Sequence, residues 1–149
     1  MDFIAFLDKL EIEIIRLVKE SGYSVEENTD LCLKGKNYVG FLNKRQKKIV
    51  ICTKNATEKE GYKLSRKNNS EIFERTAIHI KKAVRHEAVH VAQECNNGKL
   101  LNSKKYLSMN PAKEDALKGS IMISGDKEKE IEAYILEDKP RIVRKELKR

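Results

Sequence analysis

The sequence predicts an α+β domain in which a small sheet lies between helical segments. Three observations support this class. Apolar residues recur at helical spacing near the N-terminus, short β-type runs occupy residues 23–54, and a long helical pattern covers Ser70 to Cys95. A chain of 149 residues is long enough for one domain with a core and short for two. We therefore expect one domain over residues 1–138 and a basic tail or terminal helix over residues 139–149.

The first expected element is an amphipathic helix from Asp2 to Ser21. Asp2 is a suitable N-cap, and Gly22 is a suitable residue to end the helix. At 100° per residue, the apolar residues fall on one stripe: Phe3, Phe6, Leu7, Leu10, Ile14, Leu17 and Val18. Nothing on the polar face indicates chemistry, so this helix should cover one side of the sheet.

Three short strands are expected next, at Leu31–Leu33, Tyr38–Leu42 and Ile49–Cys52. The polar segment 43–48 has the right length for a hairpin turn between the last two. These runs predict a small antiparallel or mixed sheet. The following stretch, 55–69, lacks a sustained apolar period and is expected to be an exposed loop.

The strongest helical pattern runs from Ser70 to Cys95, and we allow for a break near Ile78 or Ile80. Gly98 follows as a natural left-handed residue after the helix. Further helices are expected from Asn110 to Leu117 and from Lys127 to about Asp138.

Composition and cysteine usage predict a cytoplasmic protein. No apolar run reaches the length of a membrane span, and the first residues lack the basic segment of a signal peptide. Cys32, Cys52 and Cys95 are an odd number without a CxxC pair. This pattern favours reduced thiols over a disulfide framework.

The charge is +8 overall and uneven along the chain. Residues 1–30 carry eight acids and three bases, whereas residues 31–69 carry two acids and eleven bases. A basic patch can attract nucleic acid or an acidic protein, but solvated lysine-rich loops without a partner are commoner. The basic stretches contain few aromatic residues and no Gly-aromatic RNA-binding signature, so a nucleic-acid partner is not favoured.

The stretch His86-Glu87-Ala88-Val89-His90 carries the chemistry. On a helix, the H-E-x-x-H spacing places two imidazoles on one face, where both can bind one metal ion. Glu87 projects about 100° around the helix from His86, close enough to hold a metal-bound water without being a ligand. The pattern is typical of zinc hydrolases, although a charged helix face without a ligand has the same spacing.

Catalytic zinc usually has three protein ligands, so a further ligand is needed. A third histidine six residues after His90 is absent, because that position is Asn96. A carboxylate from a later helix is the remaining option, and Glu130 and Glu132 are the two candidates. Spacing alone would also allow both to lie on a solvated helix face.

With H-E-x-x-H on one helix and E-x-E-A on a later one, the chain resembles the zincin metallopeptidases of the glutamate-liganded branch, the gluzincins. The resemblance covers roughly Lys81 to Glu137. It implies a minimal zincin-like fold in which an N-terminal helix and a small sheet pack on the H-E-x-x-H helix, followed by the glutamate-bearing helix. It also implies one Zn²⁺ per chain, held by His86, His90 and Glu130, with Glu87 as the general base.

The resemblance has two further consequences. Many of these families have an acid or amide directly after E-x-E-A that steadies a ligand histidine, whereas this chain has Tyr134, so Glu132 stays an alternative to Glu130. Zincins also hold an extended peptide against an edge strand beside the metal, and Ile49–Cys52 is the expected strand.

We therefore expect a zinc-dependent metallopeptidase that acts on a peptide or protein substrate. Tyr106 and Tyr134 are candidate donors to the oxyanion. The alternative is a catalytically inactive zinc-containing interaction module whose basic surface binds nucleic acid or an acidic protein.

Overall fold

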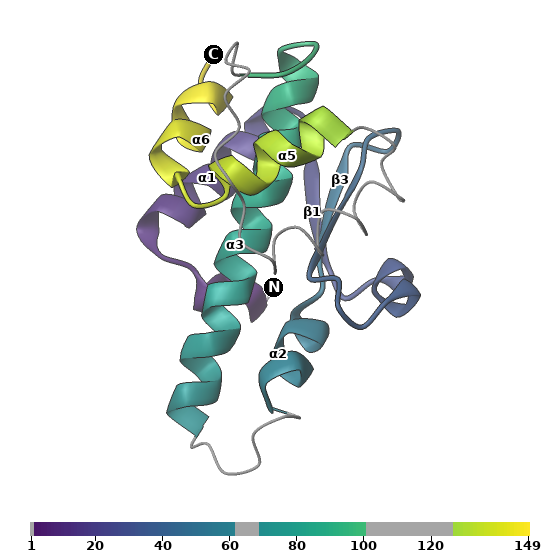
Figure 1. Cartoon of the computed structure of the whole chain (residues 1–149), viewed down its shortest axis with the longest axis vertical. Coiled ribbons are helices and arrows are strands. Elements are labelled where there is room, and N and C mark those ends of the chain that lie inside the picture. Colours follow the sequence, from purple (N-terminus) through teal and green to yellow (C-terminus); the bar gives the residue numbers. More distant parts are fainter. Residues whose placement is uncertain (1, 62–68, 101–126) are drawn as a thin grey trace.

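The computed structural model describes residues 2–61, 69–100 and 127–149 of a mixed α/β protein that is mostly helical (Figure 1). A three-stranded sheet lies on one side of the longest helix. In chain order the elements are η1 (Asp2–Phe6), α1 (Lys9–Glu20), β1 (Ser24–Glu27), η2 (Asp30–Lys34), β2 (Gly40–Asn43), β3 (Lys48–Ile51), α2 (Thr53–Gly61), α3 (Asn69–Cys95), α5 (Lys127–Leu136) and α6 (Pro140–Leu147).

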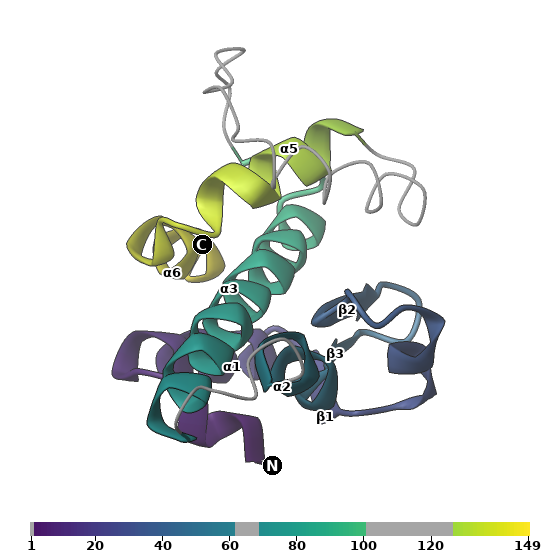
Figure 2. The same cartoon turned by 60° about the horizontal axis from the view of Figure 1, so that its bottom comes forward.

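The long helix α3 is the centre of the arrangement. Helices α1, α2, α5 and α6 and strand β2 all pack against it, and the two views place α5 across its C-terminal half (Figures 1 and 2). The apolar residues that α3 buries include Ala77, Ile80, Val84, Ala88 and Val91. The predicted helix is confirmed as one continuous element without a break near Ile78 or Ile80.

The sheet has the order β1-β3-β2, with β1 parallel and β2 antiparallel to β3. The predicted hairpin between β2 and β3 is confirmed. The predicted strand at Leu31–Leu33 is wrong, because this segment forms the 3₁₀ helix η2. Strand β1 was not expected, since Val25 is the one buried apolar side chain in its sequence Ser-Val-Glu-Glu.

The position of β3 corrects the expectation of a substrate-binding edge at Ile49–Cys52. Strand β3 lies between β1 and β2, so its backbone groups are paired on both sides. Within the described residues, β1 and β2 are the edge strands. Any extended peptide that adds to this sheet near α3 must therefore pair with β2.

The N-terminal segment is a 3₁₀ turn followed by α1, rather than the single helix predicted from Asp2 to Ser21. Asp8 is the N-cap of α1 and ion-pairs with Lys81 at 2.8 Å. The change of direction before Asp8 allows Phe3 to be fully buried and Phe6 to stack on Phe73, with ring centroids 4.6 Å apart. Periodicity misses this because both segments keep helical spacing.

The exposed loop expected over 55–69 is wrong in its first part, which is the end of helix α2. Ala56 is its one fully buried apolar residue, so the sequence has no sustained apolar period. Helix α5 confirms the element predicted from Lys127. The predicted helix Asn110–Leu117 lies outside the described residues. No helix in the described ranges combines the length and apolarity needed to cross a membrane.

Residues 139–149 contain helix α6, which begins at Pro140 and packs on α1. Arg144 lies 3.2 Å and Lys148 3.4 Å from Glu13 on α1. These two cations hold the pKa of Glu13 below its ordinary value, chiefly through the hydrogen bond from Arg144. Part of the basic C-terminus is thus paired with an acidic residue of the N-terminal helix.

A disulfide joins Cys32 in η2 to Cys52 after β3, with Cα atoms 5.6 Å apart. The expectation of reduced thiols is wrong for this pair, while Cys95 is a free, exposed cysteine. A sequence separation of 20 residues does not reveal that η2 packs beside the end of β3. The argument for a cytoplasmic location loses the support of reduced thiols.

We expect reduction of the disulfide to destabilise the protein. Closing a loop of this length in the unfolded chain corresponds to about 3 kcal/mol in the free energy of unfolding. Denaturant titrations with and without dithiothreitol would measure the change, with Cys95→Ser as the control variant. A thiol assay that detects three free cysteines in the untreated protein would contradict the pairing.

Candidate metal centre

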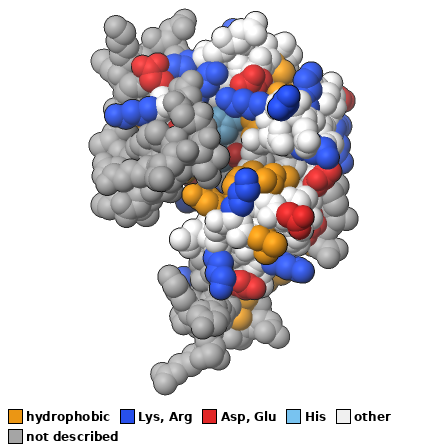
Figure 3. All heavy atoms as spheres, turned by 90° about the vertical axis from the view of Figure 1, so that its right-hand side faces the viewer, with side chains coloured by type: hydrophobic (Ala, Val, Ile, Leu, Met, Phe, Trp, Pro, Cys, Tyr) orange, Lys and Arg blue, Asp and Glu red, His pale blue; other side chains and the backbone are white. Residues whose placement is uncertain are grey.

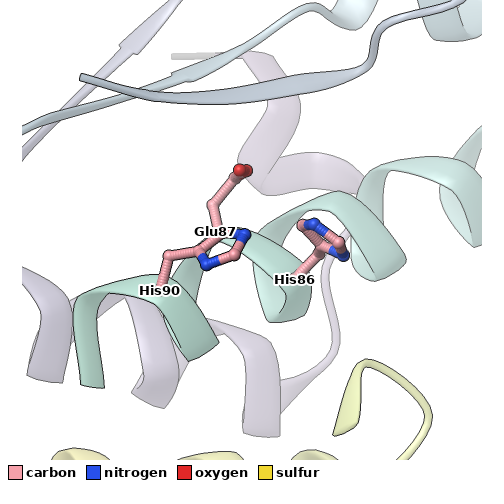
Figure 4. Close-up of side chains that lie close together, drawn as sticks. All are labelled: His86, Glu87 and His90. Atoms are coloured by element: carbon pink, nitrogen blue, oxygen red, sulfur yellow. The ribbon is translucent and has the colours of Figure 1, made fainter. Parts of the chain in front are cut away.

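Helix α3 brings His86, Glu87 and His90 together as their spacing predicts. Ligand atoms of these three side chains all lie within 4.8 Å of one another (Figure 4). The two imidazole ring centroids are 5.0 Å apart. Both histidine side chains are largely buried, with exposed fractions of 13% and 7%. Their nitrogens are therefore little hydrated, and their partners must come from the protein or a bound ligand.

The carboxylate of Glu130, on α5, lies against both histidines. Its Oε2 is 3.3 Å from Nε2 of His86, and its Oε1 is 3.0 Å from Nε2 of His90. Burial raises the pKa of Glu130, but its close contacts with the imidazoles of His86 and His90 outweigh burial and hold that pKa well below the ordinary value. Glu130 is therefore an anionic carboxylate that two Nε2 atoms share.

The Nε2 atom of His90 has a short contact without a hydrogen bond. It is buried and lies 3.0 Å from Glu130, yet none of the described residues gives it a hydrogen bond of acceptable geometry. Proximity without alignment leaves a polar atom unsatisfied. A buried nitrogen without a hydrogen bond, beside a carboxylate, has the chemistry of a metal ligand.

The outer nitrogen of His90 is fixed by the side-chain amide of Gln93. The Nδ1 of His90 is 2.8 Å from Oε1 of Gln93. The amide nitrogen of Gln93 donates to Oε1 of Glu132 at 2.9 Å and to the carbonyl of Lys129 at 3.1 Å. These bonds identify the oxygen of Gln93 as the acceptor, so His90 carries its proton on Nδ1. The lone pair of Nε2 then faces Glu130.

Glu132 has a different place from Glu130. Besides the Gln93 amide, it accepts the main-chain N–H of Leu100 at 2.8 Å. Its carboxylate therefore lies behind His90 rather than between the two Nε2 atoms. The geometry favours Glu130 over Glu132 as the third ligand, and this assignment stays a prediction.

The outer nitrogen of His86 lies 3.2 Å from Oε1 of Glu137. Burial lowers the pKa of His86, but the hydrogen bonds with Glu130 and Glu137 raise it to about 10. Without a metal, His86 is therefore an imidazolium between two carboxylates. A metal bound at Nε2 must replace the proton on that atom.

Glu87 is buried on the side of α3 that faces the sheet. Burial raises the pKa of its carboxyl group despite the opposing effect of His86 and His90. Its side chain points away from the helix (Figure 4). A Cβ atom added to Gly40 would lie 3.1 Å from Cγ of Glu87, so β2 approaches α3 at this point. The raised pKa and the neighbouring edge strand suit a proton acceptor at the side of a cleft.

The face of the molecule on the sheet side is hollowed. Figure 3 shows a histidine side chain at the bottom of the hollow, with hydrophobic and acidic side chains beside it. A histidine side chain is thus exposed on this face.

The sequence did not assign roles to Gln93 and Glu137. Gln93 follows His90 by three residues on the same helix, and this spacing is a usable signal. Glu137 has no such signal, because its contact spans 51 residues. Tyr134 packs its ring on His86, with centroids 4.5 Å apart, and Tyr106 lies outside the described residues.

Comparisons with known proteins give one match. The family model described as a domain of unknown function (DUF8637) matches residues 3–149. Neither the curated proteins nor the solved structures include a significant match. The match covers nearly the whole chain, including α6.

Replacing Glu132 with Ala should destabilise the protein. The Gln93 amide and the Leu100 N–H would lose their acceptor, which costs about 2 kcal/mol or more in unfolding free energy. Chemical denaturation of the metal-free protein would measure it. Glu128→Ala on the same helix, where the side chain is 69% exposed, should change stability by about 0.5 kcal/mol or less. Equal effects of the two substitutions would contradict the role given to Glu132.

Proposed function

The chain belongs to the DUF8637 family, whose description gives no activity, and we propose from its own site that it is a zinc-dependent metallopeptidase. One observation carries the proposal. The carboxylate of Glu130 faces the Nε2 atoms of His86 and His90, while Gln93 and Glu137 contact the outer nitrogens of the two rings. Two imidazoles and one carboxylate thus lie side by side, as the three protein ligands of one metal ion would.

The residues fit a zinc ion by donor type. Two imidazoles and one carboxylate form a common ligand set of catalytic zinc, which keeps its fourth position open. The orphaned Nε2 of His90 is the ligand atom that such an ion would satisfy. When bound, zinc would act as a Lewis acid and lower the pKa of a water molecule towards neutrality. His86, His90 and Glu130 would hold one ion per chain.

Glu87 is the proposed general base. Its carboxylate accepts the proton of the attacking water and later transfers it to the leaving amine of the cleaved peptide. The raised pKa of this buried group brings its proton affinity closer to the range in which both transfers are possible at neutral pH. Glu87 is not needed as a metal ligand, because Glu130 supplies the carboxylate.

A peptide is the proposed substrate class because an edge strand passes the site. No described strand pairs with the outer edge of β2, and Gly40 at its start lies against Glu87. An extended peptide could pair with the backbone of Gly40–Asn43 and bring a peptide bond towards Glu87. Leu42 packs into the core on the α3 side, so the strand is fixed relative to the metal ligands.

The alternative of an inactive interaction module has less support. It relied on the basic character of the middle and the C-terminus of the chain. In the structure, the C-terminal residues Arg144 and Lys148 contact Glu13 rather than extending as a free basic arm. This pairing reduces the basic surface on which the alternative depends.

Metal analysis is the first test of the proposed site. Purified protein without a histidine tag should contain about one zinc per chain after equilibration with zinc and removal of the excess. Glu130→Gln should lose the metal because it removes the anionic ligand, whereas Glu132→Gln, with the same charge change, should keep it. Elemental mass spectrometry would measure both. If the wild-type protein contains no zinc after equilibration with zinc, the proposal is wrong.

Glu87→Gln separates catalysis from metal binding. The variant should keep its zinc, because Glu87 is not a ligand, and lose at least about 100-fold in peptide hydrolysis, the usual contribution of a general base. Cleavage of a mixed peptide library, followed by mass spectrometry, would measure the rate against wild type. If the wild type cleaves the library and Glu87→Gln cleaves it equally fast, Glu87 is not the base.

A further inference from the structure

We infer that Glu137 is the positioning residue for His86, and that helix α1 holds Glu137 in place through Arg85. The inference rests on the proposed metal site. Glu137 directly follows α5, and its buried side chain places Oε1 3.2 Å from Nδ1 of His86. It contacts the imidazole edge opposite the one that faces Glu130.

The contact fixes the ring in the orientation that a metal requires. A carboxylate at Nδ1 accepts the Nδ1–H bond, so that the lone pair of His86 lies on Nε2. The negative charge also makes Nε2 a better electron donor. Histidine ligands of metals usually have such an outer partner, and its loss typically weakens metal binding by about 10- to 100-fold.

Glu137 is itself anchored at its backbone. Its N–H donates to the carbonyl of Ala133 at 2.9 Å, and its own carbonyl accepts a hydrogen bond from Nε of Arg85. Arg85 precedes His86 on α3, so one short segment of α3 contacts both the backbone and the side chain of Glu137. The carboxylate position is therefore constrained from two directions.

Helix α1 completes the support. Nη1 of Arg85 lies 3.8 Å from Oε1 of Glu11, a residue with only 2% of its surface exposed. A buried guanidinium needs an anionic partner to offset its desolvation. Glu11 thus stabilises Arg85 in the position from which it binds the Glu137 carbonyl. The N-terminal helix, expected only to cover the sheet, reaches the metal site through these contacts.

The two histidines consequently have unlike outer partners. His90 donates to the neutral amide of Gln93, whereas His86 contacts a carboxylate. The resemblance to gluzincins predicted an acid or amide directly after E-x-E-A, where Tyr134 stands. Glu137 lies three residues later, nearly one helical turn, and contacts the ring on which Tyr134 packs.

The test compares Glu137→Gln with Glu128→Gln, which removes the same charge from α5 without touching a histidine. Zinc affinity of the full-length chain would be measured by competition with a chromophoric chelator. Glu137→Gln should bind zinc about 10- to 100-fold more weakly than wild type, and Glu128→Gln should differ by less than about 3-fold. Glu11→Gln should fall between the two.

A spectroscopic readout distinguishes positioning from general stability. In zinc-loaded wild type, long-range proton–nitrogen NMR should show His86 protonated on Nδ1, with a low-field proton protected from exchange. Glu137→Gln should shift this proton upfield and leave that of His90 in place. Zinc binding by wild type without a protected Nδ1 proton on His86 overturns the inference, even if the variant does not fold.

The outcomes also separate this inference from the proposed function. A wild type that binds no zinc overturns both. If wild type and Glu137→Gln bind zinc with equal affinity, the role of Glu137 is overturned and the proposed metal site is retained.

Discussion

The contact of one carboxylate with two imidazoles depends on how α5 crosses α3. Glu130 is buried, and an isolated buried carboxylate is costly, so α5 can occupy this place only because two histidines face it. The apolar side chains of Ala133 and Leu136 on the same helix are fully buried in the shared core. Hydrophobic packing and the contact of Glu130 with the two histidines therefore favour the same position of α5 on α3.

Around this contact the polar groups form two layers. The inner atoms are the Nε2 atoms and the Glu130 carboxylate, and the outer partners are Gln93 and Glu137. Glu132 and Arg85 hold those outer partners from behind. Each imidazole is thus oriented by a side chain that is itself hydrogen-bonded, as the proposed metal site would require. Several elements far apart in the chain contribute to one small polar network.

The sheet contributes through the approach of β2 to α3. Glycine at position 40 permits the short distance to Glu87, and Leu42 holds the strand on the core. On the other face, the disulfide between Cys32 and Cys52 and the small apolar cluster with Val50 support the same strands. The edge of β2 is therefore fixed relative to the histidines, which is the condition for binding an extended chain in a defined register.

The sequence by itself determined α3, the β2–β3 hairpin, α5 and the spacing of His86, Glu87 and His90, because these depend on local periodicity and turn composition. Tertiary structure decided the remainder. Glu130, rather than Glu132, contacts both Nε2 atoms because of the way α5 faces α3. Strand β3 is central because β1 pairs with it, although the sequence of β1 contains one buried apolar residue. Glu137 and the cysteine pair are contacts between distant residues. Such contacts leave no periodic signal in a single chain, since they arise only when separate elements pack together.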